Sequence, residues 1–165
     1  MLLLKNETAS LRLDIVNYEF SEVEYGMDEY DRNWLLLRCT WTEDGEIHKD
    51  SNDCLLAQEL TELAAGLKVL AAGIKDRYDS DFIASGMTFS AWAEEDGFGA
   101  MMTFYLPNTM DGDDTAEVVS HLTAQELKEF IAELDKDCAK FPLTTPSKWS
   151  TSSIPSLGSS PPSRT

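Results

Sequence analysis

Hydrophobic periodicity changes repeatedly along residues 9–141, and these changes constrain the fold more than any other feature. A period of two, typical of half-buried strands, covers residues 11–18 and 33–42. Apolar residues at three- and four-residue steps then predict a helix with a core-facing stripe of Leu56, Leu60, Leu63, Leu67 and Leu70. The same order, strands followed by a helix, returns in the second half of the chain.

Turn and capping signals divide the first half into elements. Glu43-Asp44-Gly45 predicts a hairpin, with an antiparallel strand returning over residues 46–50. Ser51-Asn52-Asp53 offers N-caps for the helix, and Gly73 suits its C-terminal end. Gly66 inside this helix costs about 1 kcal/mol relative to alanine, so we predict that the helix packs closely on the sheet.

The second half contains another hairpin and another helix. Residues 87–94 and 100–106 alternate on either side of a glycine-containing turn, and residues 116–122 predict a last strand. Thr123 and Glu126 have the spacing of a capping box at the start of the second helix. We therefore predict an α+β fold, an antiparallel β-sheet built from hairpins with two main helices packed on it.

Composition changes near the C-terminus. Residues 142–165 hold five of the six prolines, eight serines and four threonines, and they contain no acidic residue. Such a segment buries too little apolar surface to offset its chain entropy. We predict one globular domain over residues 1–142 and a disordered Ser/Thr/Pro-rich tail over residues 143–165.

The chain is strongly acidic. Its 165 residues include 30 Asp and Glu against 13 Lys and Arg, a net charge of −17. This balance argues against nucleic acid or an anionic membrane as partner and favours a basic protein. The N-terminal residues are too short an apolar run for a signal peptide, and no transmembrane stretch is apparent, so the predicted location is cytoplasmic.

Catalytic and metal-binding signatures are absent from the sequence. Cys39, Cys54 and Cys138 lack the spacing of a disulfide framework or, with His48 and His121, of a zinc site. No GxSxG, HExxH, P-loop or GxGxxG pattern occurs. We predict that the protein is not an enzyme and uses no cofactor and no metal ion.

Two short acidic segments add negative surface. Asp111-Gly112-Asp113-Asp114 does not have the spacing of an EF-hand calcium loop and predicts a surface turn. Glu94-Glu95-Asp96 lies in the second predicted hairpin.

An acidic stretch with interleaved aromatic residues is the candidate partner-binding site. Aromatic anchors with a negative rim fit the basic face of a protein partner. A solvated loop whose aromatics pack on the sheet is the alternative interpretation. The candidate partner-binding residues are Glu19, Glu22, Glu24, Tyr25, Asp28, Glu29, Tyr30 and Asp31.

Several landmarks resemble the WapI-type immunity proteins, which protect bacteria against polymorphic or contact-dependent toxins. The best is Asn33-Trp34-Leu35, within the strand entry Asp31-Arg-Asn-Trp-Leu35 that follows the acidic stretch. Asp53-Cys54-Leu55-Leu56 before the first helix, the Met87-Thr-Phe89 strand and the terminal Phe141-Pro142 also fit. The resemblance spans about residues 9–142.

The resemblance implies a non-catalytic immunity protein that binds and neutralises a cognate bacterial toxin domain. The acidic surface makes a basic nuclease the expected toxin, because the substrate groove of a nuclease is basic. The alternative is a small structural or regulatory protein-binding module. Gene context separates the two, since an immunity protein is encoded beside its toxin.

Overall fold

The computed structural model describes residues 2–18, 33–83, 85–105 and 115–143. The acidic stretch from Glu19 to Asp31, the Asp111–Asp114 segment and most of the predicted tail lie outside the described residues. Within the described ranges, eight strands and two helices follow one another in an order that repeats: four strands and then a helix, twice.

The first four strands and the first helix make up one half of the fold. Their bounds are Leu2–Lys5 (β1), Ala9–Tyr18 (β2), Trp34–Glu43 (β3), Glu46–Leu56 (β4) and Ala57–Ala71 (α2). The second half has the same composition. Its bounds are Arg77–Asp79 (β5), Met87–Glu94 (β6), Gly97–Tyr105 (β7), Thr115–Leu122 (β8) and Ala124–Lys140 (α3).

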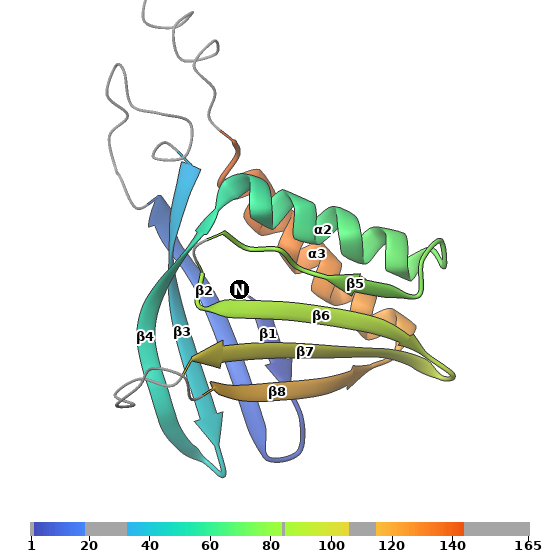
Figure 1. Ribbon diagram of the computed structural model, residues 1–165, viewed down its shortest axis with the longest axis horizontal. Coiled ribbons are helices and arrows are strands. Elements are labelled where there is room, and N and C mark those ends of the chain that lie inside the picture. Colours follow the sequence, from blue (N-terminus) through green and yellow to red (C-terminus); the bar gives the residue numbers. More distant parts are fainter. Residues whose placement is uncertain (1, 19–32, 84, 106–114, 144–165) are drawn as a thin grey trace, which may run out of the picture.

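The predicted α+β class is confirmed, with the strands divided between two antiparallel sheets. Strands β1 to β4 pair in sequence order in the first sheet, and β5 to β8 do so in the second. The division follows from α2, which carries the chain away from β4 so that β5 begins a new sheet. Figure 1 shows the two sheets crossing steeply, with both helices on one side of the second sheet.

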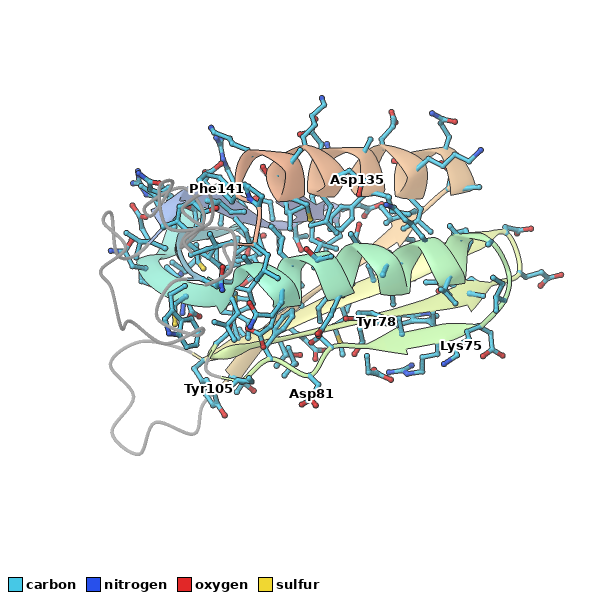
Figure 2. All side chains as sticks on the ribbon, turned by 90° about the horizontal axis from the view of Figure 1, so that it is seen from above. Lys75, Tyr78, Asp81, Tyr105, Asp135 and Phe141 are labelled. Carbon is cyan, nitrogen blue, oxygen red and sulfur yellow. The ribbon has the colours of Figure 1, made fainter. Side chains whose placement is uncertain are left out.

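The two helices lie side by side over the core (Figure 2). The predicted leucine stripe of α2 is buried, with Leu63 and Leu67 at most 2% exposed. Leu127, Ile131 and Leu134 of α3 are buried, and Phe130 is half-buried against Phe89 of β6. The core therefore lies between the helices and the inner faces of both sheets.

The hairpin predicted at Glu43-Asp44-Gly45 is confirmed. Glu43 pairs with Glu46, and Asp44 and Gly45 have φ values of 52° and 82°. Two positive φ values are typical of the turn whose twist matches that of the flanking strands, and Asp-Gly is a preferred pair there. In the second hairpin Glu94 pairs with Gly97, so the returning strand begins at Gly97 rather than at the predicted residue 100.

The predicted start of the first helix at Ser51-Asn52-Asp53 is wrong. These residues continue β4, where they pair with Cys39, Arg38 and Leu37 of β3. Strand pairing over the full length of β3 outweighs their capping preference. The helix begins at Ala57, and the Glu59 carboxylate there accepts a hydrogen bond from the Leu56 amide at 3.0 Å.

Candidate partner-binding groove

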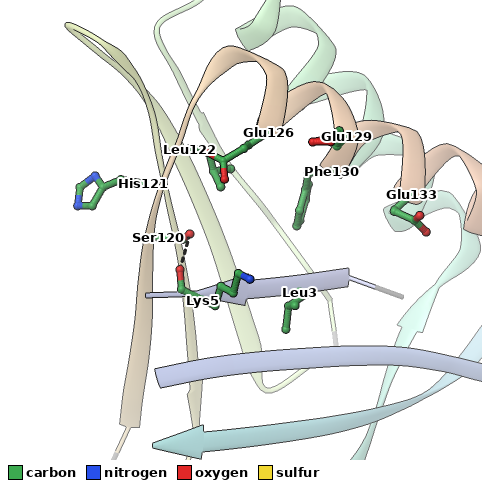
Figure 3. A pocket seen from close by; sticks show the side chains of 9 residues that line it. All are labelled: Leu3, Lys5, Ser120, His121, Leu122, Glu126, Glu129, Phe130 and Glu133. Carbon is green, nitrogen blue, oxygen red and sulfur yellow. Dashed lines mark hydrogen bonds between the residues drawn. The ribbon is translucent and has the colours of Figure 1, made fainter. Parts of the chain in front are cut away.

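A surface groove of about 350 Å³ lies where α3 passes the meeting point of β1 and β8 (Figure 3). We call it the α3 groove. Its lining residues come from β1, near the N-terminus, and from β8 and α3, which follow each other near the C-terminal end of the described chain: Leu3, Lys5, Ser120, His121, Leu122, Glu126, Glu129, Phe130 and Glu133. The opposite ends of the described chain thus build one concave surface.

One wall of the α3 groove is the outer side of α3. Glu126, Glu129 and Glu133 follow one another at three- and four-residue spacing, which places them on one side of a helix. The buried stripe of Leu127, Ile131 and Leu134 occupies the opposite side. The sequence of α3 therefore fixes an acidic wall by the same periodicity that fixes its core face.

The other wall is β1, whose alternation exposes two side chains. Leu2 and Leu4 point into the core, whereas Leu3 is 36% exposed and Lys5 is also exposed. Figure 3 shows Phe130 pointing from α3 toward β1, where Leu3 and Lys5 lie. The floor is therefore apolar, and the charges lie around it.

Two hydrogen bonds join β8 to β1 and to the turn that follows β1. The Ser120 hydroxyl donates to the Lys5 carbonyl oxygen at 2.7 Å, and the Asn6 side-chain amide donates to the Val119 carbonyl oxygen at 2.9 Å. The Asn6 side-chain oxygen also accepts from the Ala9 amide at 2.9 Å, which fixes the turn that follows β1. The edges of the two sheets are joined by side chains rather than by a continuous ladder.

The α3 groove is net acidic, with three carboxylates and one ammonium group. Glu126 accepts the Thr123 amide in the predicted capping box, which is confirmed, and Glu133 forms a 3.3 Å ion pair with Lys136. Within the described ranges, neither Lys5 nor the carboxylate of Glu129 has an ion-pair partner. The carboxylate of Glu129 can therefore accept hydrogen bonds from a cationic group.

A second, adjacent hollow extends the acidic surface to the turn between β6 and β7. It is lined in part by Glu94, Glu95 and Asp96, and it shares His121 and Leu122 with the α3 groove. These three acidic residues were recognised in the sequence as negative surface. The structure brings them next to α3, which the sequence did not predict.

The Glu94 carboxylate is held in place by two donors. His121 Nδ1 lies 3.0 Å from one of its oxygens, and the Trp92 indole donates to the other at 3.1 Å. These two hydrogen bonds, the one with His121 foremost, lower the pKa of Glu94 below its ordinary value. Glu94 therefore remains ionised at neutral pH.

The remaining candidate chemistry is dispersed. His48 packs against Trp41, with ring centroids 5.3 Å apart, and His121 pairs with Glu94. The three cysteines are free thiols, and burial raises the pKa of Cys39 to about 12. Among the residues that the structure describes, no group of three or more His, Cys, Asp or Glu side chains could hold a metal ion.

The candidate partner-binding residues predicted from sequence lie outside the described residues. These are Glu19, Glu22, Glu24, Tyr25, Asp28, Glu29, Tyr30 and Asp31. The chain leaves β2 at Tyr18 and is described again from Asn33. Tyr18 donates to the Pro142 carbonyl oxygen at 2.5 Å, so the base of this segment lies beside the C-terminal end of α3.

The fold is similar to that of plant proteins of known structure. WHY3 from Arabidopsis thaliana has a TM-score of 0.51 at 13% identity, covering 94% of each chain, and WHY1 from the same plant has 0.50 at 13%, covering 97% of this chain and 94% of that one. The plant transcriptional regulator PBF-2 has 0.49 at 12%, covering 96% and 88%. At these identities the likeness concerns the fold alone. No curated protein matches.

The described residues form an acidic α+β fold with a concave surface lined by carboxylates of α3. The chain belongs to the Immunity protein WapI-like family, whose model matches residues 1–142. This match confirms the resemblance drawn from the sequence, and membership supports an immunity role with a cognate toxin as partner. In the described ranges no helix is both long and apolar enough to cross a membrane.

Proposed function

We propose that the protein neutralises its cognate toxin by stoichiometric, non-catalytic binding through its acidic surface. The observation that carries the proposal is the family match over residues 1–142, in a chain whose net charge is −17. The alternative of a structural or regulatory module has no comparable support. Binding of this kind needs no cofactor, and we propose that it takes place in the cytoplasm.

Charge makes a basic nuclease domain the best-suited toxin. Residues 1–141 carry 30 acidic and 11 basic side chains, a net charge of −19. A field of this sign accelerates encounter with a cationic protein and repels nucleic acid. A nuclease binds the phosphate backbone through Lys and Arg side chains, so an acidic inhibitor can occupy the same surface. The inhibitor would then exclude the substrate.

The acidic stretch 19–31 is one proposed docking segment. It combines six carboxylates with the aromatic residues Phe20, Tyr25 and Tyr30. Replacing Glu22, Glu24, Asp28 and Glu29 by lysine is expected to slow association with the toxin and to weaken its salt dependence. Unchanged association rates would exclude this segment as the docking face.

A co-expression survival assay tests the function directly. Cells express the C-terminal domain of the protein encoded immediately upstream of this gene. They express it alone, with the wild-type protein, or with the four-lysine variant. Rescue by the wild type, with one-to-one co-purification, is the expected result. A toxic domain that is not rescued would contradict the immunity role and favour the alternative of a binding module with another partner.

A further inference from the structure

We infer that the α3 groove accepts an arginine side chain of the toxin domain. The inference rests on the proposed function and names a part of its interface. It assigns the contact to α3, β1 and β8, near the N-terminal end of α3. The base of the 19–31 segment lies beside the C-terminal end of the same helix.

The shape of the α3 groove suits a long side chain with an apolar stem. Leu3, Leu122 and the half-buried Phe130 provide apolar surface, and the carboxylates of α3 lie along one side of it. The aliphatic stem of an arginine would cover this floor, because long basic side chains bury their stems while their heads stay polar. A purely apolar side chain would cover the floor but pair with none of the carboxylates, and an acidic side chain would be repelled by them.

The charges of the groove favour arginine over lysine. A guanidinium group is planar, so it can stack on Phe130 and present its fork of donors to a carboxylate. Glu129 has no partner within the described ranges, and it lies between Glu126 and Glu133 on the same wall. Lys5 lies on the opposite wall, so an incoming cation is drawn toward α3 and away from β1.

Association kinetics with the upstream-encoded toxin domain test the inference. The double variant Glu129→Lys with Glu133→Lys leaves the Glu126 cap of α3 intact. The control combines Glu46→Lys on β4 with Glu62→Lys on α2, two exposed carboxylates that line neither hollow. Both double variants change the net charge by the same amount. Circular dichroism and urea unfolding confirm that each is folded.

We expect the groove variant to associate at least about tenfold more slowly at low salt, and the control less than about threefold more slowly. Lys5→Glu should accelerate association, because it removes the cation on the β1 wall. Equal effects of the groove and control variants would overturn the inference. If the wild type itself failed to bind or rescue, the proposed function would fail, and the inference would fall with it.

A double-mutant cycle tests the choice of arginine. Each arginine and each lysine on the basic surface of the toxin domain is replaced by alanine and measured against wild type and Glu129→Gln. One arginine should lose most of its effect in the Glu129→Gln background. Coupling to a lysine alone, or to no residue, would overturn the assignment while leaving the immunity role intact.

Discussion

The Tyr78 ring of β5 lies directly against the backbone of α2 at Gly66, in the space that a β-carbon on residue 66 would occupy. Figure 2 shows Tyr78 beside the middle of this helix. The close packing predicted from a glycine inside a leucine-rich helix is therefore confirmed. The contact joins the helix of the first half to the edge strand of the second sheet, so it helps to hold the two halves together.

Gly66→Ala should destabilise the protein although alanine is the better helix former. The added methyl group must displace the Tyr78 ring, and we expect the free energy of unfolding to fall by about 2 kcal/mol in urea denaturation. In a Tyr78→Ala background the same substitution should become neutral or stabilising, by up to about 1 kcal/mol. A stabilising effect of Gly66→Ala in the otherwise wild-type protein would contradict this account.

Glu59 is a buried carboxylate, 3% exposed, that joins the start of α2 to the segment before β6. Its two oxygens accept from the Leu56 amide at 3.0 Å and the Ile83 amide at 2.7 Å. Glu59→Ala removes the acceptor of both amides, which should cost about 3 kcal/mol of unfolding free energy. Glu59→Gln retains one acceptor oxygen and should cost about half as much.

Glu62→Gln is the matched control for this prediction, because it lies on the same helix and is exposed. It should change the unfolding free energy by less than about 0.5 kcal/mol. Equal midpoints of urea denaturation for Glu59→Ala and Glu62→Gln would show that the two hydrogen bonds contribute nothing measurable.

Cys39 should resist thiol reagents in the folded protein. Its side chain is fully buried, with Sγ 3.7 Å from Met87 Sδ, and burial raises its pKa to about 12. At pH 8 a disulfide reagent should modify the partly buried Cys54 and Cys138 first, and Cys39 only in denaturant. Peptide mass spectrometry identifies the modified residue. Native-state labelling of Cys39 at the rate of the other two would contradict its burial.

The same thiol should reduce stability in alkali. In the unfolded chain Cys39 ionises near its ordinary pKa of about 8.5, whereas in the folded protein it remains neutral until about pH 12. Its contribution to stability is therefore complete below about pH 8.5 and is lost progressively above that pH. Urea denaturation between pH 7 and 10 measures the free energy of unfolding of wild type and of Cys39→Ala. The difference between these two free energies should decrease as the pH rises.

Glu94 should contribute to stability at neutral pH and lose that contribution in acid. Its pKa is lowered in the folded protein by the hydrogen bonds with His121 and Trp92. The contribution is complete above the unfolded pKa of about 4.3 and disappears as the pH falls through the lower folded value. The difference in urea midpoint between wild type and Glu94→Gln should therefore decrease from pH 6 toward acid. Glu95→Gln, at the next position, makes the same change of charge and is the matched control.

Local signals in the sequence predicted most of the elements. The Asp44-Gly45 turn, the Thr123 cap and the leucine stripe of α2 each depend on residues within one turn or a few helical steps. Strand β1 was not predicted, because three consecutive leucines hide the alternation that buries Leu2 and Leu4 and exposes Leu3. The short β5 was likewise missed, since three residues give no usable period.

The α3 groove had no comparable signal. Glu126, Glu129 and Glu133 are ordinary on the exposed side of a helix, and Leu3 is an ordinary surface leucine. They come together in one groove only because the sheets cross and bring β1 beside β8. The pairing of β3 with residues 51–53 also depends on residues outside that segment. The capping preference of residues 51–53 therefore predicted the wrong start for the first helix.

The hydrogen bond between Ser120 and Lys5 spans 115 residues of sequence. During translation β1 therefore leaves the ribosome long before β8 exists, and the α3 groove is complete only after α3 has also emerged. Contacts of such long range slow folding. If the toxin docks in the α3 groove as we propose, a newly made molecule can bind it only once synthesis of the domain has finished, and the stock of protein already folded sets the response to an arriving toxin.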